Sequence, residues 1–406
     1  MSAVEARQQQ YVLPKAIVAL LALTCGLAVA NLYYVQPLLN DVGGALDVGE
    51  TATGLLVTAS QVGYVLGLAL LVPVGDLVER RRLIATLLFA AALAAVGCAA
   101  APAFPVLAAA LVALGLLSTV AQIVVPLASS LAGPEERGQV VGTVMSGLLI
   151  GILSARTLSG LVAELGGWRL VFALGAVAMV LLAVVLARVL PLAPPPERTA
   201  YTRLLRSVLT LIGSEPLLRQ RMALGAFGFA CFSILWTAIA FLLGGHYGYG
   251  EGVIGLFGLA GIAGAAVAPL SGRLADRGHG RAAVTLFLVL LLASWALLDL
   301  GGTSIVALVA GIVVLDLGVQ GAHINHQATI YALRPEARSR VTTAYMVSMF
   351  GGGVAGSVVA ATVYGAAGWD ATCLLGAGMA AAALLVWGLT QRLATYARRP
   401  IRPAAG

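Results

Sequence analysis

Charged residues are scarce in this chain. Asp, Glu, Lys and Arg make up 10% of its 406 residues, whereas hydrophobic residues make up 60%. This balance excludes an ordinary soluble globular protein, in which about a quarter of the residues are charged. Lysine is almost absent, since Lys15 is the only one, and no Gly-x-x-x-x-Gly-Lys-Ser/Thr loop occurs. The sequence therefore gives no sign of an ATP-driven pump.

Metal and disulfide chemistry also lack support. The four cysteines, Cys25, Cys98, Cys231 and Cys373, form no CxxC pair and all fall in apolar segments, so neither a zinc site nor a disulfide framework is expected. The pair His323 and His326 has no acidic or cysteine ligand nearby in sequence, which argues against a metal site. We expect no cofactor. The first fifteen residues lack the apolar core of a cleaved signal peptide, so the first apolar segment is expected to remain in the protein.

Long apolar segments dominate what is present. Runs of about 20 apolar residues are long enough to cross a bilayer as helices. Twelve segments fit, and the sequence predicts an all-α integral membrane protein. They lie at about 15–39, 52–74, 83–101, 104–131, 139–165, 169–190, 219–244, 252–271, 282–300, 304–331, 341–365 and 370–393.

The net charge of +7 is a topology signal. If the N-terminus lies inside, all but two of the 24 Lys and Arg residues fall on one side of the predicted membrane. The exceptions are Arg156, inside the fifth segment, and Arg169, at an outer end. Cytoplasmic loops carry such an excess of basic residues, so both termini are expected in the cytoplasm. The basic balance therefore requires no nucleic-acid partner.

The chain contains an internal repeat. Residues 134–137 read Pro-Glu-Glu-Arg and residues 335–338 read Pro-Glu-Ala-Arg, and the same offset carries Trp168 onto Trp369. The longest connection, 191–218, is rich in proline and arginine. We expect two pseudo-symmetric six-helix bundles, 1–190 and 219–406, joined by a cytoplasmic linker at 191–218. A two-fold repeat of membrane helices is typical of secondary transporters.

A loop motif also repeats. Residues 272–277 read Gly-Arg-Leu-Ala-Asp-Arg after the eighth segment, and a degenerate copy after the second keeps Asp76, Arg80 and Arg81 but has Leu77 and Glu79 at two motif positions. With twelve segments in two halves, this motif resembles the major facilitator superfamily over essentially the whole chain. Residues 31–38, Asn-Leu-Tyr-Tyr-Val-Gln-Pro-Leu, are similar to a bacterial branch of efflux carriers.

The chain departs from proton-coupled efflux members in two places. The fourth segment has no arginine in its Leu114–Gln122 stretch, and no proline follows Gly147 and Gly151 in the fifth. Proton-driven antiport therefore does not follow from the resemblance alone.

The resemblance implies a conformational latch at the loop motif. An acid at a helix end can face a helix N-terminus and nearby arginines, and such a contact holds the two halves in one state. The alternative is that the arginines only anchor the loop at the lipid headgroups. The residues concerned are Asp76, Arg80, Arg81, Gly272, Asp276, Arg277 and Arg281.

Two charges at membrane depth predict the coupling site. Asp316 falls near the middle of the tenth segment and Arg156 well inside the fifth. Burying either one alone costs at least ~2.5–3.5 kcal/mol, so each should face a partner or a wet cavity. We expect Asp316 to bind a proton or a substrate cation and Arg156 to hold it ionised in one state or to bind an anionic substrate group. A static bridge between them is the alternative.

Polar side chains around these charges predict a central cavity. Asp316, Gln320, His323 and Gln327 share one helical face, with His323 as a relay or hydrogen-bond partner of Asp316. Ser118, Gln122 and Ser129 form the repeat-related face of the fourth segment. Further cavity candidates are Asn31, Tyr34, Gln61 and Trp236, although tyrosines near a boundary also suit the interfacial aromatic belt.

Glycines recur at close spacing in segments 2, 5, 8 and 11. They include Gly63, Gly67, Gly147, Gly151, Gly255, Gly258, Gly261, Gly264, Gly352 and Gly356. Small residues let helix backbones approach closely. The pattern predicts either an interface on which the halves rock or ordinary tight packing.

The function expected from these features is proton-coupled export of small organic compounds, such as drugs or metabolites, by alternating access in a bacterial inner membrane. The expected partners are a small-molecule substrate and the bilayer, with the protein as a monomer. A proton-coupled uptake symporter on the same fold is the main alternative. A membrane sensor or an intramembrane enzyme is remote, because no soluble output domain or nucleophile–base set is evident.

Overall fold

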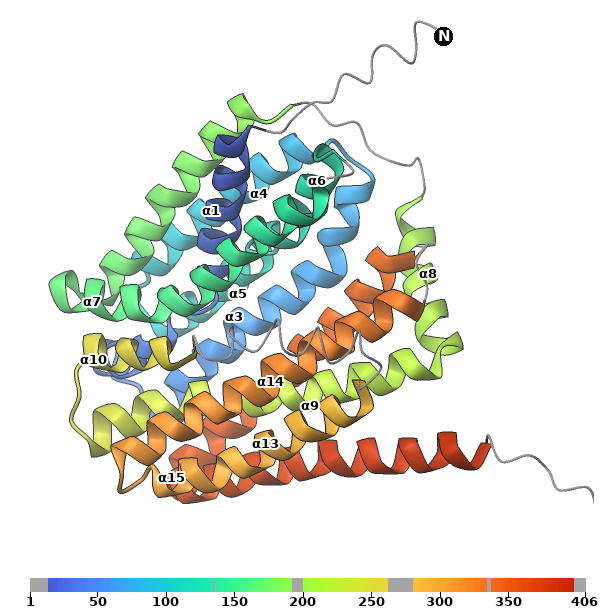
Figure 1. Cartoon of the computed structure of the whole chain (residues 1–406). Coiled ribbons are helices and arrows are strands. Elements are labelled where there is room, and N and C mark those ends of the chain that lie inside the picture. Colours follow the sequence, from blue (N-terminus) through green and yellow to red (C-terminus); the bar gives the residue numbers. More distant parts are fainter. Residues whose placement is uncertain (1–13, 134–135, 192–199, 262–279, 334–336, 398–406) are drawn as a thin grey trace, which may run out of the picture.

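The computed structural model describes residues 14–133, 136–191, 200–261, 280–333 and 337–397 (Figure 1). Every regular element in these ranges is helical. Among the described residues, eight helices are long and apolar enough to cross a membrane, and α1 (Lys15–Ala30) is a shorter apolar helix. The all-α prediction is confirmed for the described ranges, whereas the count of twelve spans and the location of the termini stay predictions.

The N-terminal half contains six further α-helices after α1. They are α2 (Leu39–Leu46), α3 (Glu50–Leu70), α4 (Arg80–Ala99), α5 (Phe104–Leu117), α6 (Val120–Leu131) and α7 (Arg137–Val189). Short 3-10 turns at Gln36–Leu38 and Val72–Asp76 follow the ends of α1 and α3. The chain unwinds at Asn31, before Pro37, so the first helix is shorter than the sequence predicts.

The connection between the halves contains a helix, α8 (Tyr201–Ser214), none of whose residues is buried. The C-terminal half follows with α9 (Pro216–Phe241), a π-helical turn at Leu242–His246, α10 (Glu251–Leu256), a 3-10 turn at Phe257–Gly261, α13 (Gly280–Leu300), α14 (Ile305–Leu333) and α15 (Arg338–Ala397). In Figure 1 most helices of the blue-to-green N-terminal half lie above the light-green-to-red helices α9–α15, and α3 runs down toward them.

α7 and α15 each consist of two helical segments joined at a sharp bend, and each is long enough for two spans. The apolar stretch Gly138–Val189 has 52 residues, about 78 Å of helix against about 30 Å of hydrocarbon. Its backbone leaves helical geometry at Gly166 and Gly167, where Gly167 has φ 74°. α15 has the equivalent break at Gly368, also with φ 74°. Only glycine adopts this φ readily, so the repeated Gly-Trp sequences mark the two bends.

Many large apolar side chains lie on the outer surface of the protein, whereas a few charged side chains are buried in its interior. Leu158, Leu161 and Leu165 on α7 and Leu93 on α4 are exposed leucines among many others. Arg156, Arg221 and Asp316 are buried, with exposed fractions of 3%, 6% and 4%. This inside-out distribution is expected for a protein surrounded by lipid.

Candidate functional site

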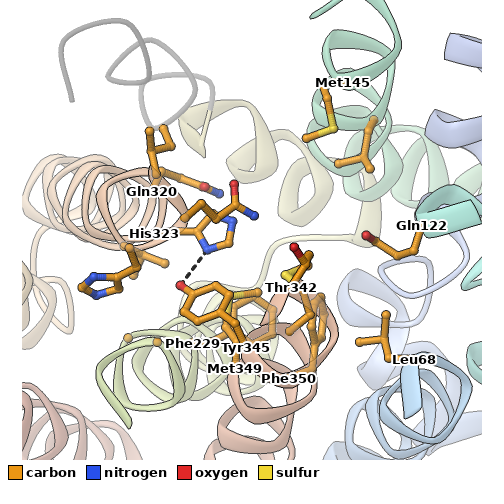
Figure 2. A pocket seen from close by; sticks show the side chains of 18 of the residues that line it. Leu68, Gln122, Met145, Phe229, Gln320, His323, Thr342, Tyr345, Met349 and Phe350 are labelled. Atoms are coloured by element: carbon orange, nitrogen blue, oxygen red, sulfur yellow. Dashed lines mark hydrogen bonds between the residues drawn. The ribbon is translucent and has the colours of Figure 1, made fainter. Parts of the chain in front are cut away.

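A cavity of about 690 Å³ lies between the two halves. In Figure 2, Gln122 and Met145 of the N-terminal half face Gln320, His323 and Tyr345 of the C-terminal half across this space. Most of the wall is apolar or aromatic, with Leu68, Phe229, Met349 and Phe350 among its members. A cavity of this volume and character suits a small organic molecule.

The polar groups of the wall come from both halves. His323 Nδ1 lies 2.9 Å from the Tyr345 hydroxyl, the contact drawn as a dashed line in Figure 2. On the opposite side Gln122 Nε2 donates to the Tyr64 hydroxyl over 3.3 Å. Gln320 and Gln327 also line the cavity, so three of the four members of the predicted α14 face reach it. Each polar group is available to orient a bound molecule in an otherwise apolar space.

The cavity occupies one end of the protein. We call the end that carries Arg80, Arg188 and Arg281 the basic end, and the end that carries Asp47 and Glu251 the acidic end. The wall extends from Tyr33 and Phe232 to residues close to the basic ends of their helices, namely Val72, Ser129, Tyr331 and Thr342.

At the acidic end the two halves are held together by hydrogen bonds. Glu164 Oε1 accepts from the Gly252 N–H over 3.0 Å, and Thr157 donates to the Gly255 carbonyl over 2.9 Å. Asn40 Nδ2 also donates to the Ala240 carbonyl at 2.8 Å, and the Thr58 and Ser357 hydroxyls lie 2.8 Å apart. α7 packs on α10 and α3 on α15 at this interface.

Two aromatic rings form the floor of the cavity and separate it from Arg156. Tyr33 and Phe232 line the cavity, and the guanidinium carbon of Arg156 lies 4.7 and 5.4 Å from their ring centroids. The Trp236 ring, on the face of α9 predicted from sequence, lies closer, at 3.9 Å. Arg156 therefore lies in an aromatic box, where cation–π attraction offsets part of its desolvation.

One hydrogen bond fixes the Arg156 side chain. Its Nε donates to Gln36 Oε1 over 2.6 Å, while its Nη2 is buried without a hydrogen-bond partner. Gln36 was missed from the sequence, although it follows the two tyrosines in the Asn31–Leu38 motif as a polar residue at the end of an apolar segment. The arginine is thus oriented by the N-terminal half and covered by rings from both halves.

Asp316 lies next to this box. Its carboxyl group interacts electrostatically with Arg156 and with the Trp236 indole, and the indole contact is longer than a hydrogen bond of 3.5 Å. Within the described ranges, however, no ion pair of 4.0 Å or less joins Asp316 to Arg156. Asp316 Oδ1 and Trp236 Nε1 are both buried without a hydrogen-bond partner. The two predicted charges are therefore neighbours, but the static bridge considered from the sequence is absent in this state.

Other predicted cavity residues lie elsewhere. Asn31 donates to Ser118 over 3.2 Å and to Met179 over 3.6 Å, so both polar residues are inside the N-terminal half and not in the cavity wall. Tyr34 packs against the edge of Phe172. Gln61 Nε2 donates to Ser233 over 3.1 Å and joins the two halves. None of these four residues lines the cavity in this state, because their side chains are engaged by neighbouring helices, and their role in binding stays a prediction. Trp236, Arg156 and Asp316 lie behind the floor.

The predicted latch is described only at three arginines. Arg80 Nε donates to the Gly75 carbonyl, and Arg81 Nη1 donates to the Leu190 carbonyl at the end of α7, both over 3.0 Å. Arg281 is exposed at the start of α13. The Asp76 side chain, Gly272, Asp276 and Arg277 lie outside the described residues.

The glycine pattern mostly serves packing within each half. Gly63 and Gly67 abut α5, Gly147 and Gly151 abut α1, and Gly352 and Gly356 abut α9, so these six glycines serve tight packing inside a half, the second of the two expected roles. Glycines that do lie between the halves are Gly54 against Ala361, Gly160 against Glu251, Gly255 against Arg156 and Gly365 against Thr51.

A second buried polar cluster was not predicted. Arg221 Nη1 lies 3.2 Å from His326 Nδ1, and its guanidinium lies 5.0 Å from the Trp387 ring. His326 also meets the Tyr345 ring edge-on. Arg221 falls at the start of the predicted segment 219–244, where an arginine is ordinary, so its contact with α14 has no signal in the sequence.

Comparison with known proteins identifies the family. The model of the Major Facilitator Superfamily matches residues 18–333. This chain belongs to the Major Facilitator Superfamily. Over 378 residues it is 49% identical to the "Uncharacterized transporter YgaY" of Escherichia coli O157:H7, covering 92% of this chain and 95% of that protein. It is 35% identical over 383 residues to the "Probable transporter SCO4007" of Streptomyces coelicolor, covering 93% of this chain and 87% of that protein.

Solved structures of superfamily transporters share the fold. A bacterial homolog of the human lysosomal transporter Spinster, in an inward-facing and occupied conformation, superposes with a TM-score of 0.74 at 13% identity, covering 96% of this chain and 99% of that chain. The nucleoside transporter NupG superposes with a TM-score of 0.73 at 16% identity, covering 92% of this chain and 99% of that chain. The protein is therefore a multi-pass membrane transporter of this superfamily and not an enzyme.

Proposed function

We propose that this transporter exports small organic compounds from the bacterial cytoplasm in exchange for protons. The observation that carries this proposal is the position of Asp316: a carboxyl group with one unpartnered oxygen, buried between the halves directly behind the floor of the cavity. A buried carboxylate is costly unless it is neutralised, so its proton occupancy is coupled to its surroundings.

The state of the molecule supports the direction of access. The cavity reaches the basic end, while four cross-half hydrogen bonds join the halves at the acidic end. If the basic end lies in the cytoplasm, as the positive-inside rule predicts, this is an inward-facing state. Rocking of the halves would break the contacts at the acidic end and close the cavity at the other.

Coupling follows from the need to neutralise Asp316 twice in the cycle. With substrate absent, a proton on Asp316 removes the cost of its charge while the halves exchange states. When substrate is bound, it interacts with the ionised Asp316 carboxylate in place of the proton. Proton and substrate therefore exclude each other. Mutual exclusion at one group gives antiport.

An uptake symporter remains the second candidate. It is favoured by the fifth segment, in which Gly147 and Gly151 pack on α1 without the proline that antiporters of the family carry there. In a symporter, substrate and proton would bind together, and Asp316 would be protonated when substrate is present.

A substrate panel on everted membrane vesicles with a pH-sensitive dye tests both candidates. With the interior acidified, addition of a substrate to an antiporter should move protons out of the vesicle, and Asp316→Asn should abolish this signal. Asp370→Asn, a matched change at an exposed acid, should leave it intact. Full proton movement in Asp316→Asn would refute the coupling role, and proton movement in the same direction as substrate would establish the symporter.

A further inference from the structure

The aromatic box leaves two adjacent hydrogen-bond donors without partners. Arg156 Nη2 is unpartnered although Nε of the same group is bonded to Gln36. Trp236 Nε1 makes no hydrogen bond of 3.5 Å or less, although the indole interacts with the Asp316 carboxyl group beside it and its ring centroid lies 3.9 Å from the guanidinium carbon. Both side chains are more than nine-tenths buried. Two neighbouring N–H donors, one of them cationic, are groups that recognise a carboxylate.

An acceptor lies beside these donors. Asp316 Oδ1 is equally buried and unpartnered, and the carboxyl group is not paired with Arg156 within 4.0 Å in the described ranges. The titratable groups that act on Asp316 from the packed elements are Arg156 of α7 and Tyr33 after α1. A free carboxylate oxygen of this kind recognises an ammonium group.

We propose that the transported compound is a small zwitterion, with its carboxylate on Arg156 and Trp236, its ammonium on Asp316 and its apolar body against the rings of the floor. The charges of the site, one positive and one negative, match those of a zwitterion. A monoanion would satisfy Arg156 but lie beside the Asp316 carboxylate, and a monocation would satisfy Asp316 but lie beside Arg156; both suffer like-charge repulsion at low dielectric.

This inference rests on the proposed function, because only an ionised Asp316 binds the ammonium group. Protonation of Asp316 removes the acceptor and releases the zwitterion, which is the order of events that antiport requires. Tyr33 and Phe232 separate the cavity from Arg156 in the present state. These two rings must therefore move before a zwitterion in the cavity can reach Arg156.

Calorimetric titration of the purified full-length transporter with matched probes tests the inference. The zwitterions are phenylalanine, leucine and the longer aminocaproate. Phenethylamine and isoamylamine lack the carboxylate, while phenylpropionate and isocaproate lack the ammonium. We expect phenylalanine or leucine to bind about tenfold or more tightly than both of its singly charged analogues, because each lost charged hydrogen bond weakens binding by that order. Aminocaproate reports whether the two groups need a wider separation.

Variants assign the two ends of the probe. Arg156→Gln should reduce zwitterion affinity to that of the amine, and Asp316→Asn should reduce it to that of the acid. Trp236→Phe keeps the ring and removes only the N–H, so it should weaken zwitterions and acids but not amines, even if the other variants fold poorly. Arg188→Gln, at an exposed arginine, is the matched control and should change nothing.

The inference is overturned if no zwitterion binds, or if an amine or acid binds as tightly as its parent. Its failure is distinguishable from failure of the proposed function. Amines that drive proton movement while amino acids do not would refute the zwitterion and retain the antiporter. Amino acids that bind but move no protons would retain the zwitterion and refute proton coupling.

Discussion

The guanidinium carbon of Arg156 lies 3.9 Å from the ring centroid of Trp236. Arg156 belongs to α7 of the N-terminal half and Trp236 to α9 of the C-terminal half, so this contact crosses the interface on which the halves are expected to move. Asp316 lies beside both. A change in the relative position of the halves must therefore change the environment of the charged groups, which is the physical requirement for coupling.

Arg156→Lys should fail to preserve transport. The planar guanidinium stacks on Trp236 and simultaneously donates through Nε to Gln36. A lysine ammonium keeps the charge but has neither the plane nor the fork, so we expect transport to fall by about tenfold or more. Uptake into vesicles is the measurement, with Arg188→Lys as the control. Normal transport by Arg156→Lys would show that only the charge matters.

Phe232→Ala should expose Asp316 to the cavity. Phe232 contributes one of the two floor rings and is itself stacked on Phe229 at 5.1 Å. Removing the ring opens the floor of the cavity toward Arg156 and Asp316. Water and small reagents should then reach the Asp316 carboxyl group. We expect several-fold faster modification of Asp316 by a carbodiimide, measured by mass spectrometry. Phe172→Ala, a buried change inside the N-terminal half, should not accelerate it.

Alanine at two glycines of α7 should have different effects. A Cβ on Gly160 would lie 2.2 Å from the Glu251 carbonyl oxygen of the other half, whereas a Cβ on Gly151 would lie 2.3 Å from Gly26 of the same half. Gly160→Ala should therefore push the halves apart at the acidic end, and Gly151→Ala should instead lower thermal stability.

Spin labels at the exposed positions Ala45 and His246, one in each half, would report this separation. The four native cysteines are buried and should not compete for the label. We expect longer label–label distances in Gly160→Ala and unchanged distances in Gly151→Ala. An unchanged label–label distance in Gly160→Ala would show that local shifts accommodate the added methyl group without separating the halves.

Glu79→Ala should destabilise the start of α4. The Glu79 carboxylate accepts hydrogen bonds from the Arg81 and Arg82 backbone N–H groups, both over 2.9 Å. Losing an N-cap of this kind costs about 1 kcal/mol, and we expect a lower Tm in thermal unfolding of the purified protein. The Arg82 side chain is exposed, and its Nε lies 4.0 Å from Glu79 Oε2, which makes a weak ion pair. Arg82→Ala should therefore lower the Tm much less. Equal losses in the two variants would contradict the capping role.

Several features of the site could be predicted from the sequence because each depends on local pattern. Asp316 and Arg156 stand out since charge is rare in apolar segments. Gln320, His323 and Gln327 follow helical spacing, and all three line the cavity. The same spacing could not show that the cavity ends before Asp316, because its floor is made by Tyr33 and Phe232 from two other helices.

Glycine spacing had the same limit. The sequence correctly indicates that helices approach closely at Gly147 and Gly151, but the partner is α1 of the same half. A small residue permits close approach to any backbone, and only the arrangement of the bundle selects which one. Likewise Tyr34 is a candidate wall residue by sequence, yet its ring packs on the edge of Phe172 inside the N-terminal half.

The sequence by itself determined the membrane setting, the repeated halves and the two rare charges, since hydropathy, internal repetition and composition are properties of the chain alone. Tertiary structure decided what those charges meet. Arg156 turns to Gln36 and three aromatic rings, and Asp316 keeps an unpartnered oxygen nearby. Which groups neutralise a buried charge depends on side chains from distant segments, and only packing of the two halves brings these together.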